Sequence, residues 1–536
     1  MMKSKTKWYL VGVAVVIIAI LSSYVLYDTF LKPPPPPQRL VISKIAEADS
    51  LDPAVSGMIE GGRVYEVIFD SYFAYDMSGQ MQPWLAESYQ WSPDGKILTL
   101  NLRKDVKFHN GDPFNATAVK YSIERILDPT TKSPAAATVA EVSKVEVTDT
   151  YTAKIYLKAP NRFFLDTLAG GAAGSPVCPS VAKKLGKDFG TTNPVGTGPF
   201  IFKEWRRDDR IVLVKNKNYN WAPAFTKHTG PALLDEIVFK VIPEDTTRAA
   251  DLRTPEGANM ATRVPENQVG NLRQDPNLKI LTAPEGRVLF LSMNLERMTD
   301  ARIRQAVAHA IDRDAINKAV YFNLYQPAYS PLQSTLPPFY EDMEKTGKAR
   351  LYDTKKSAAL LDDAGWKLGA DGYRYKEGKI LELTAVQYIN IEAMIVVQDQ
   401  LKKVGIKMNL VEFRGDRQGW YSRLTASTFD MTMASWQSNT PALEWFFFSG
   451  QIPWPNWVRF SSTDFETLVN TGKTDPDQNK AIAAYYKAQE MIIDQAVWAP
   501  LFYSQNIVGI RKNVLNYNLP PRTGSWMYLD VTVATS

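Results

Sequence analysis

Polar and apolar residues follow two different periods along the chain, and this pattern predicts a mixture of strands and helices. Residues 97–103, ILTLNLR, alternate apolar and polar side chains as a strand does, and residues 40–45, LVISKI, form a second predicted strand. The turn sequence WSPDG at residues 91–95 leads into the first of these strands. We therefore predict a β-hairpin around this turn.

Other segments repeat apolar residues at helical spacing. Asn115 is a predicted N-cap for a helix through residues 118–127. A second helix is expected to begin at Thr299 or Asp300, because its apolar residues fall on one face: Ile303, Ala306, Val307, Ala310 and Ile311. His309 lies off this face, so we expect it at the surface rather than in a metal site.

Helices and strands are also predicted in the second half of the chain. Residues 353–366 have an Asp or Thr N-cap and a closing glycine, as a short amphipathic helix does. Residues 392–413 predict a helix closed by Gly405 and then an alternating strand. Because these elements alternate irregularly and no repeat of 20 to 50 residues is present, the pattern predicts an α/β fold without a regular βα series.

The N-terminal segment predicts a membrane anchor. Residues 8–27 are twenty residues without a charge, which is long enough for a helix to cross a bilayer, and Lys3, Lys5 and Lys7 precede them. This charge pattern keeps the N-terminus cytoplasmic and exports the rest. A cleaved signal peptide is the alternative, but no small-x-small cleavage site follows the apolar run. The five prolines at residues 33–37 predict an extended stalk.

Length and charge narrow the class of protein. A chain of 536 residues exceeds what one hydrophobic core organises, so three or four folded units are expected. The net charge is +5, and four lysines against one aspartate before position 33 supply +3 of it. The body is therefore nearly neutral, which excludes the basic face of a nucleic-acid-binding protein. The single cysteine, Cys178, excludes an internal disulfide and is expected to be a small buried hydrophobe.

Motifs of enzymes and cofactor sites are incomplete. His109, His228 and His309 are the only histidines, and none stands in a metal-binding pair. Residues 471–474, TGKT, resemble the end of a phosphate-binding loop, but Thr467 replaces its first glycine, and we predict an ordinary loop there. The sequence predicts no enzyme, no cofactor and no metal site, although a hydrolase with two carboxylates brought together by folding stays open.

Several longer strings, in their order and spacing, resemble one protein family. They cover nearly the whole chain from about residue 40 to 520. The family is the family 5 extracellular solute-binding proteins, the dipeptide and oligopeptide receptors of ABC importers. The strings are residues 85–95 with LAES and WSPDG, 102–114, 119–125, NPVGTGPFIFKEW at 193–205, LLDEIVFKVIPEDTTR at 233–248, RIRQAVAHAIDRDAI at 302–316 and PLFYSQNIVGIRKNV at 500–514.

The resemblance implies a bilobed fold whose two lobes close about a hinge over a ligand. It is an α/β, periplasmic-binding-protein-like fold, type II and cluster C-like, with an extra inserted domain. Transferred to this chain, the layout is a membrane anchor at 1–32 with its helix at about 8–27, a proline-rich stalk at 33–38, Domain I at 39–72, 200–285 and 507–536, Domain II at 73–199, and Domain III at 286–506.

Two departures from the family pattern bear on the ligand. Peptide receptors of this family carry a Gly-Trp-x-x-Asp-x-x-Asp-Pro pattern that sets an aspartate against the ligand ammonium, whereas Asn439 occupies the acidic position here. An amide cannot offset a desolvated ammonium as a carboxylate does. In addition, no arginine for the ligand carboxylate stands at residues 386–390. Both departures weaken the case for recognition of a dipeptide.

Loops between the lobes are expected to carry the ligand contacts. The segment at 445–460 is rich in tryptophan and phenylalanine, which stack on sugar rings. Phe446 to Phe448 are expected in the core, whereas an exposed Trp454 or Trp457 would line the cleft. The ligand-binding residues that we predict are Ser56, Gly57, Tyr388, Trp436, Asn439, Trp454, Asn456 and Trp457.

The sequence therefore predicts an oligopeptide receptor on the extracytoplasmic face of the cell membrane, held by a single-pass helix. Its expected partners are the permease subunits of an ABC importer, and its body is expected to be monomeric. A receptor for neutral oligosaccharides and a membrane-anchored ligand sensor without transport remain as alternatives. No nucleic-acid partner is expected.

The anchor is testable by fractionation. We expect the full-length protein to remain in the membrane fraction after an alkaline carbonate wash, because residues 8–27 span the bilayer. A truncated protein that begins at residue 39 should be soluble. N-terminal sequencing of the mature protein is the control, and a first residue near position 30 would contradict the uncleaved anchor.

Overall fold

The computed structural model describes residues 37–336, 338–437, 440–520 and 524–534. Residues 39–536 form one compact unit. The predicted anchor helix at 8–27 lies outside the described residues, as do the first four prolines of the stalk. Within the described ranges, no helix has both the length and the apolar composition that a membrane crossing needs.

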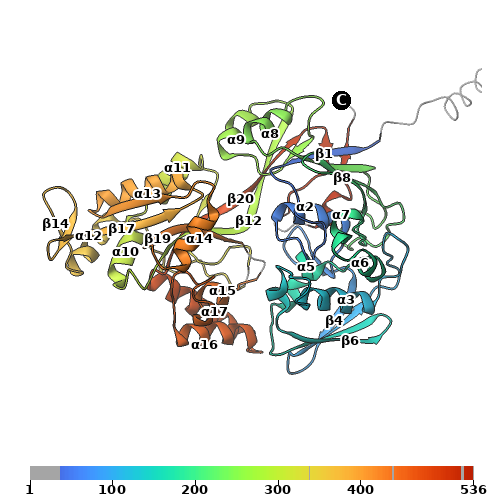
Figure 1. Cartoon of the computed structure of the whole chain (residues 1–536), viewed down its shortest axis with the longest axis horizontal. Coiled ribbons are helices and arrows are strands. Elements are labelled where there is room, and N and C mark those ends of the chain that lie inside the picture. Colours follow the sequence, from blue (N-terminus) through green and yellow to red (C-terminus); the bar gives the residue numbers. More distant parts are fainter. Residues whose placement is uncertain (1–36, 337, 438–439, 521–523, 535–536) are drawn as a thin grey trace, which may run out of the picture. The chain divides into compact units, whose positions relative to one another are not determined.

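A mixed sheet of 11 strands runs through this unit (Figure 1). Its strands come from distant parts of the chain, so the fold depends on long-range pairing. In spatial order they are β18 (Lys407–Glu412), β17 (Glu382–Gln387), β19 (Met431–Gln437), β12 (Leu278–Met293), β20 (Trp498–Arg511), β11 (Met260–Ala261), β1 (Arg39–Lys44), β10 (Glu236–Val241), β9 (Arg210–Lys215) and β8 (Phe200–Arg206), and β13 (Gln326–Pro327) also pairs with β20.

Two long strands divide this unit into two lobes. Hydrophobic cores lie on either side of them, and we name lobe A the residues 39–284 and 505–534, and lobe B the residues 285–504. β12 has 16 residues and carries the chain from lobe A to lobe B, while β20, with 14 residues, carries it back. Because the two strands pair antiparallel from Leu278 and Arg511 to Ser292 and Trp498, one ladder connects both lobes.

The ladder is interrupted where the lobes meet. Its register shifts between Pro284 and Val288, and Gly286 at this bulge has a φ of +67°. A left-handed backbone at this position suits glycine because it has no Cβ. The Domain I and Domain III limit expected at 285/286 falls inside β12 at this bulge. The limit expected at 506/507 falls inside β20, where Asn506 and Ile507 pair with Ala283 and Thr282 just before the bulge.

Lobe A also contains a sheet of its own. The predicted hairpin is confirmed, since the strands on either side of the WSPDG turn pair antiparallel and Gly95 has a φ of +67°. The predicted cap is confirmed too, because the Asn115 side chain accepts from the backbone N–H of Thr117 and Ala118. The elements are β4 (Ala86–Trp91), β5 (Ile97–Leu102), β7 (Thr152–Leu157) and β6 (Val142–Asp149), in the order β4-β5-β7-β6, and α3 (Ala116–Leu127).

One buried carboxylate joins the three passes of the chain that build the rest of lobe A. Asp70, which is 0% exposed, accepts from Trp221 Nε1 at 2.9 Å and from Ser525 Oγ at 3.0 Å. Burial raises the pKa of Asp70 to about 7, and the hydrogen bonds from Trp221 and Ser525 oppose this rise. The other elements of lobe A are α2 (Ile59–Ile68), β2 (Phe73–Tyr75), β3 (Met81–Pro83), α4 (Phe164–Thr167), α5 (Gly171–Gly174), α6 (Pro179–Leu185), α7 (Phe189–Thr192), α8 (Asp245–Asp251), α9 (Glu266–Arg273), β21 (Val514–Leu515) and β22 (Thr532–Val533).

Lobe B confirms three of the predicted helices. Asp300 caps the first, Asp353 caps the second, and Gly405 follows the third. The expected surface position of His309 is wrong, because its ring is 3% exposed and its Nδ1 lies 2.7 Å from the Leu351 carbonyl oxygen. The elements are α10 (Ala301–Ala310), α11 (Arg313–Val320), α12 (Thr354–Asp363), α13 (Ile391–Lys403), α14 (Arg417–Thr425), α15 (Glu444–Phe447), β14 (Lys367–Leu368), β15 (Arg374–Lys376) and β16 (Lys379–Ile380).

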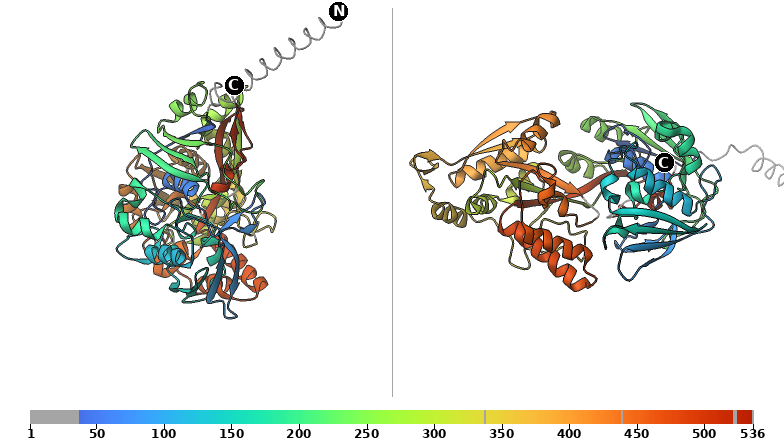
Figure 2. Two further views of the ribbon diagram at one scale, coloured as in Figure 1. Left: turned by 90° about the vertical axis from the view of Figure 1, so that its right-hand side faces the viewer. Right: turned by 60° about the horizontal axis from the view of Figure 1, so that its bottom comes forward.

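The predicted loop at 471–474 is wrong, because these residues form the last turn of α16 (Thr463–Thr474). This helix packs against α17 (Gln478–Asp494), and Figure 2 (right) brings the pair forward. Gly472 faces the ring of the buried Tyr485, and a Cβ at this position would collide with that ring. The glycine therefore serves close helix packing rather than phosphate binding.

Two helical glycines make a matched test of this packing. Gly472→Ala should destabilise the protein by about 1–3 kcal/mol, because overpacking forces Tyr485 or the helix to move. Gly270→Ala in α9 is the control. Nothing lies within 4 Å of the Cβ that the alanine would add, so its higher helix propensity should stabilise the protein by up to about 1 kcal/mol. Urea denaturation of both variants measures the effects. If the two variants unfolded at the same urea concentration, the close approach of Gly472 to Tyr485 would have no effect on the free energy of unfolding.

Candidate functional site

A polar cavity of ≈ 430 Å³ lies between the lobes at the bulge in β12. Lobe A lines it with the loop before α2, with α2 itself and with residues 169–172, whereas lobe B contributes Thr335 and Gln437. Pro284, Glu285 and Gly286 form the wall that both lobes share. A volume of this size is in the range of small-molecule sites.

The loop before α2 is shaped by one carboxylate. Asp49 accepts from Ser56 Oγ at 2.7 Å and from the backbone N–H of Gly57 at 2.7 Å. Gly61 packs directly against Asp49 and Ser56, where a Cβ would collide with both side chains. These contacts hold Ser56 and Gly57 at the cavity wall.

Buried charges lie beneath this wall. Glu60 is 4% exposed, and its Oε1 lies 3.4 Å from Arg63 Nε and 3.8 Å from Arg263 Nε. Lys44, which is also buried, donates to the Ala46 carbonyl at 2.7 Å, and burial lowers the pKa of its ammonium. Because each ion has a partner of opposite charge or a carbonyl nearby, the cost of their burial is partly offset.

The bulge in β12 connects these charges to lobe B. Glu285 lies 3.4 Å from Arg263 and 3.2 Å from Arg287, and it accepts from Ser504 Oγ at 2.9 Å. Arg287 in turn donates to the Gln437 side chain at 2.9 Å. The side-chain amide of Gln437 donates back to the Glu285 carbonyl at 2.9 Å. Arg263 of lobe A and Ser504 and Gln437 of lobe B are thus held to Glu285 and Arg287 at the hinge.

The lobes meet a second time, away from the hinge. The backbone N–H of Arg162 in lobe A donates to the Lys473 carbonyl in lobe B at 3.2 Å. Lys473 pairs with Glu141 of lobe A and, at 3.3 Å, with Glu444 of lobe B. Burial opposes the charge of Lys473, but Glu444 and Glu141 outweigh it and raise the pKa of its ammonium. Phe163 of lobe A packs in the core of lobe B, so polar and apolar contacts coincide here.

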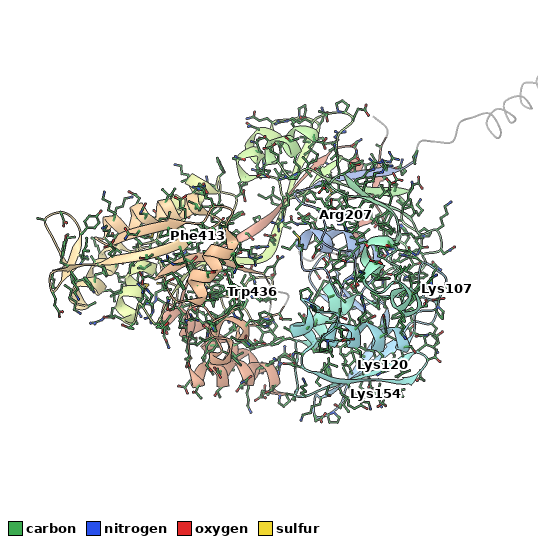
Figure 3. The ribbon with its side chains drawn as sticks, viewed as in Figure 1. Lys107, Lys120, Lys154, Arg207, Phe413 and Trp436 are labelled. Carbon is green, nitrogen blue, oxygen red and sulfur yellow. The ribbon has the colours of Figure 1, made fainter. Side chains whose placement is uncertain are left out.

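Two of the predicted binding residues, Ser56 and Gly57, line the cavity. Trp436 is partly exposed and precedes the lining residue Gln437, and Figure 3 places it on the side of lobe B that faces lobe A. Tyr388 and Trp454 are partly buried in an aromatic cluster outside the lining, where Tyr388 packs on Trp420 with ring centres 4.7 Å apart. Asn439 lies outside the described residues.

Two other predicted residues serve the core of lobe B. Asn456 is 0% exposed, and its side-chain amide donates to the carbonyls of Phe448 at 3.0 Å and Phe460 at 2.7 Å. Trp457 is 4% exposed and donates to Ser292 Oγ at 2.9 Å, so the expectation that it is exposed is wrong. Both side chains are used to hold the loop onto the sheet. Phe446 and Phe447 are buried, as expected, whereas Phe448 is only partly buried.

Sequence reasoning missed the charged residues of the site. Arg63 and Glu285 have no motif around them, and Gln437 stands one residue beyond a predicted tryptophan. One signal was present: Glu60 and Arg63 lie three residues apart near the start of a helix that also carries Glu66, next to the predicted Ser56 and Gly57. Among the residues that the structure describes, no cluster of three metal-ligating side chains occurs.

A comparison with protein families gives one match for this chain. Residues 80–452 match the model of "Bacterial extracellular solute-binding proteins, family 5 Middle". The match covers the whole four-stranded sheet of lobe A and most of lobe B, and it leaves out β1 and β20 of the 11-stranded sheet.

Individual relatives align over nearly the whole chain. The glutathione-binding protein GsiB of Escherichia coli O1:K1 / APEC is 27% identical over 504 residues, which is 91% of this chain and 93% of that protein. The periplasmic binding protein DppA of Helicobacter pylori, solved with the peptide STSA, has a TM-score of 0.74 and 27% identity, over 92% of this chain and 98% of that one. The oligopeptide-binding protein AppA of Bacillus subtilis, solved with a nonapeptide, has a TM-score of 0.75 and 23% identity, over 93% and 100%, which shows the fold alone.

The contact at Lys473 predicts how easily the lobes separate. Lys473→Met keeps an unbranched side chain one atom shorter and removes the charge that pairs with Glu141. The ligand-free protein should therefore have a larger radius of gyration in solution scattering. Lys480→Met, on an exposed position of α17, is the matched control and should leave the scattering unchanged. An unchanged curve for both variants would mean that this contact does not hold the lobes together.

Proposed function

Since the chain belongs to family 5 of the bacterial extracellular solute-binding proteins, which are binding proteins and not enzymes, we propose that it delivers short peptides to an ABC importer. The family supports a solute-binding receptor for peptide import. The finer claims, that the ligand is a short peptide and that the receptor is anchored in the cell membrane, are part of this proposal.

The observation that carries the proposal is the cavity of ≈ 430 Å³ between lobes joined by two continuous strands. A site walled by both lobes binds a ligand most tightly when the lobes close on it. The bulge at Gly286 breaks the register of the connecting ladder where the lobes meet, and a second register shift follows between Leu289 and Phe290. Closure about this point would bring Gln437 and Ser56 onto the same ligand.

A peptide is favoured over an oligosaccharide by the lining of the cavity. GsiB is named as a glutathione-binding protein, and the Helicobacter pylori protein was solved with a tetrapeptide. Sugar sites use aromatic faces, and the lining contains the aromatic rings of Tyr65 and Tyr75 but neither Trp436 nor Trp454. It also contains the charged residues Arg63, Glu66 and Glu285. The lining also contains Ser56–Gly57 and Gly170–Gly171, whose small side chains leave the backbone accessible. Backbone N–H and carbonyl groups can form hydrogen bonds with an extended peptide.

Delivery requires the receptor to stay near the permease. The uncharged segment at 8–27 and the proline run at 33–37 support a receptor held on the extracytoplasmic face by a single helix. Tethering raises the effective concentration of the receptor at the permease, as any short linker does. A ligand sensor would share these features, and the presence of permease and ATPase genes beside its own gene distinguishes the two functions.

The proposal is tested by ligand binding and lobe closure. A protein that begins at residue 39 should bind glutathione or the tetrapeptide Ser-Thr-Ser-Ala in calorimetry, with an affinity in the micromolar range or better. Solution scattering with bound peptide should show a smaller radius of gyration. Mass spectrometry should recover the peptide unchanged.

Two controls separate this function from its rivals. Maltotriose, a neutral oligosaccharide, should produce no heat and no compaction. Binding of maltotriose instead of peptides would replace the peptide proposal by the oligosaccharide alternative, and recovery of a cleaved peptide would indicate a hydrolase.

A further inference from the structure

Arg63 lines the cavity, and its guanidinium makes no hydrogen bond to any residue that the structure describes. Its side chain is 18% exposed, and its Nε is buried without a hydrogen-bond partner. Within the described residues, its one ion partner is Glu60, whose Oε1 lies 3.4 Å from that Nε, and no hydrogen bond joins the two. A guanidinium has five N–H donors, and leaving them unpaired in a cavity is unfavourable.

The other charged residues of the lining already have partners. Glu285 is held by Arg263, Arg287 and Ser504, and Glu66 is engaged as well. Arg63 is thus the one cation among the described lining residues, and the group that best matches its donors is a planar anion. A carboxylate accepts two parallel N–H bonds from a guanidinium, which a sugar hydroxyl or a peptide amide does not.

The charges beneath Arg63 fix its position. Glu60 is buried between Arg63 and Arg263, and Arg263 continues to Glu285 at 3.4 Å. The signs therefore alternate from the cavity floor to the hinge. The ion pair with Glu60 limits the movement of the guanidinium, so little conformational entropy is lost when an anion binds.

We propose that Arg63 binds the terminal carboxylate of the peptide, so that the ligand class is the free-acid peptide. The proposal rests on the peptide-binding function above. In this protein the carboxylate subsite lies on α2 of lobe A, next to Ser56 and Gly57.

The first experiment compares two forms of the same peptides on the wild-type protein. A pool of di- to pentapeptides with free C-termini and the same pool as C-terminal amides are each passed over the immobilised protein, and the retained peptides are identified by mass spectrometry. Free acids should be retained about 10- to 100-fold more strongly, because the amide lacks the charge-assisted bonds to Arg63. Maltotriose is included as a neutral probe and should not be retained.

The second experiment assigns the effect to Arg63. Arg63→Gln should lower the affinity for a retained free-acid peptide about 10- to 100-fold and change the affinity for its amide less than about twofold. Arg63→Lys keeps the charge without the fork of donors and should show an intermediate loss. Arg206→Gln, at a residue of β8 whose side chain is 59% exposed, is the control and should bind as the wild type does.

The outcomes are distinguishable. Equal retention of acids and amides by the wild-type protein would overturn the carboxylate assignment of Arg63 and leave the peptide function standing. Equal losses of affinity for both forms in Arg63→Gln would do the same. Retention of neither pool would overturn the peptide function and the peptide carboxylate subsite with it. If Arg63→Gln does not fold, as judged by its thermal unfolding, the wild-type comparison and Arg63→Lys still decide the question.

Discussion

The antiparallel pair of β12 and β20 is the constraint on which the other parts of the molecule depend. The chain passes between the lobes on these two strands, which also carry the 11-stranded sheet from one hydrophobic core to the other. A paired ladder resists separation of its strands but still bends where its register is broken. The bulge from Pro284 to Val288 supplies that break at the point where the lobes meet.

The charges around the bulge explain why a site for an anion forms at this place. The charges alternate in sign from lobe A to lobe B, in the order Glu60, Arg263, Glu285 and Arg287. Arg287 donates a hydrogen bond to the Gln437 side chain. Each partly buried ion in this series is compensated by the next one, which is the condition for keeping charges out of water. Arg63, at the cavity end of the series, has a compensating charge on one side and open donors on the other.

The second contact between the lobes has a different physical character. At the bulge the lobes share backbone, whereas at Lys473 they meet through side chains, with Phe163 of lobe A packed in the core of lobe B. Side-chain contacts of this kind form and break without unfolding either lobe. A hinge of shared backbone and a separable contact at a distance are the two elements that a receptor with closing lobes needs.

The sequence by itself determined the family and the local elements, because hairpins, caps and helix faces depend on neighbouring residues. The WSPDG hairpin, the Asn115 cap and the Gly405 terminus are all confirmed for this reason. Only the tertiary structure decided which side chains face the cavity. Asn456 and Trp457 are buried in the core of their own lobe, and the TGKT segment ends a helix that packs on Tyr485. Arg63 lines the same cavity as Glu285, which is 222 residues away in the chain. Burial and charge pairing at such separations depend on how the strands are ordered in the sheet, and no local pattern of residues carries that order.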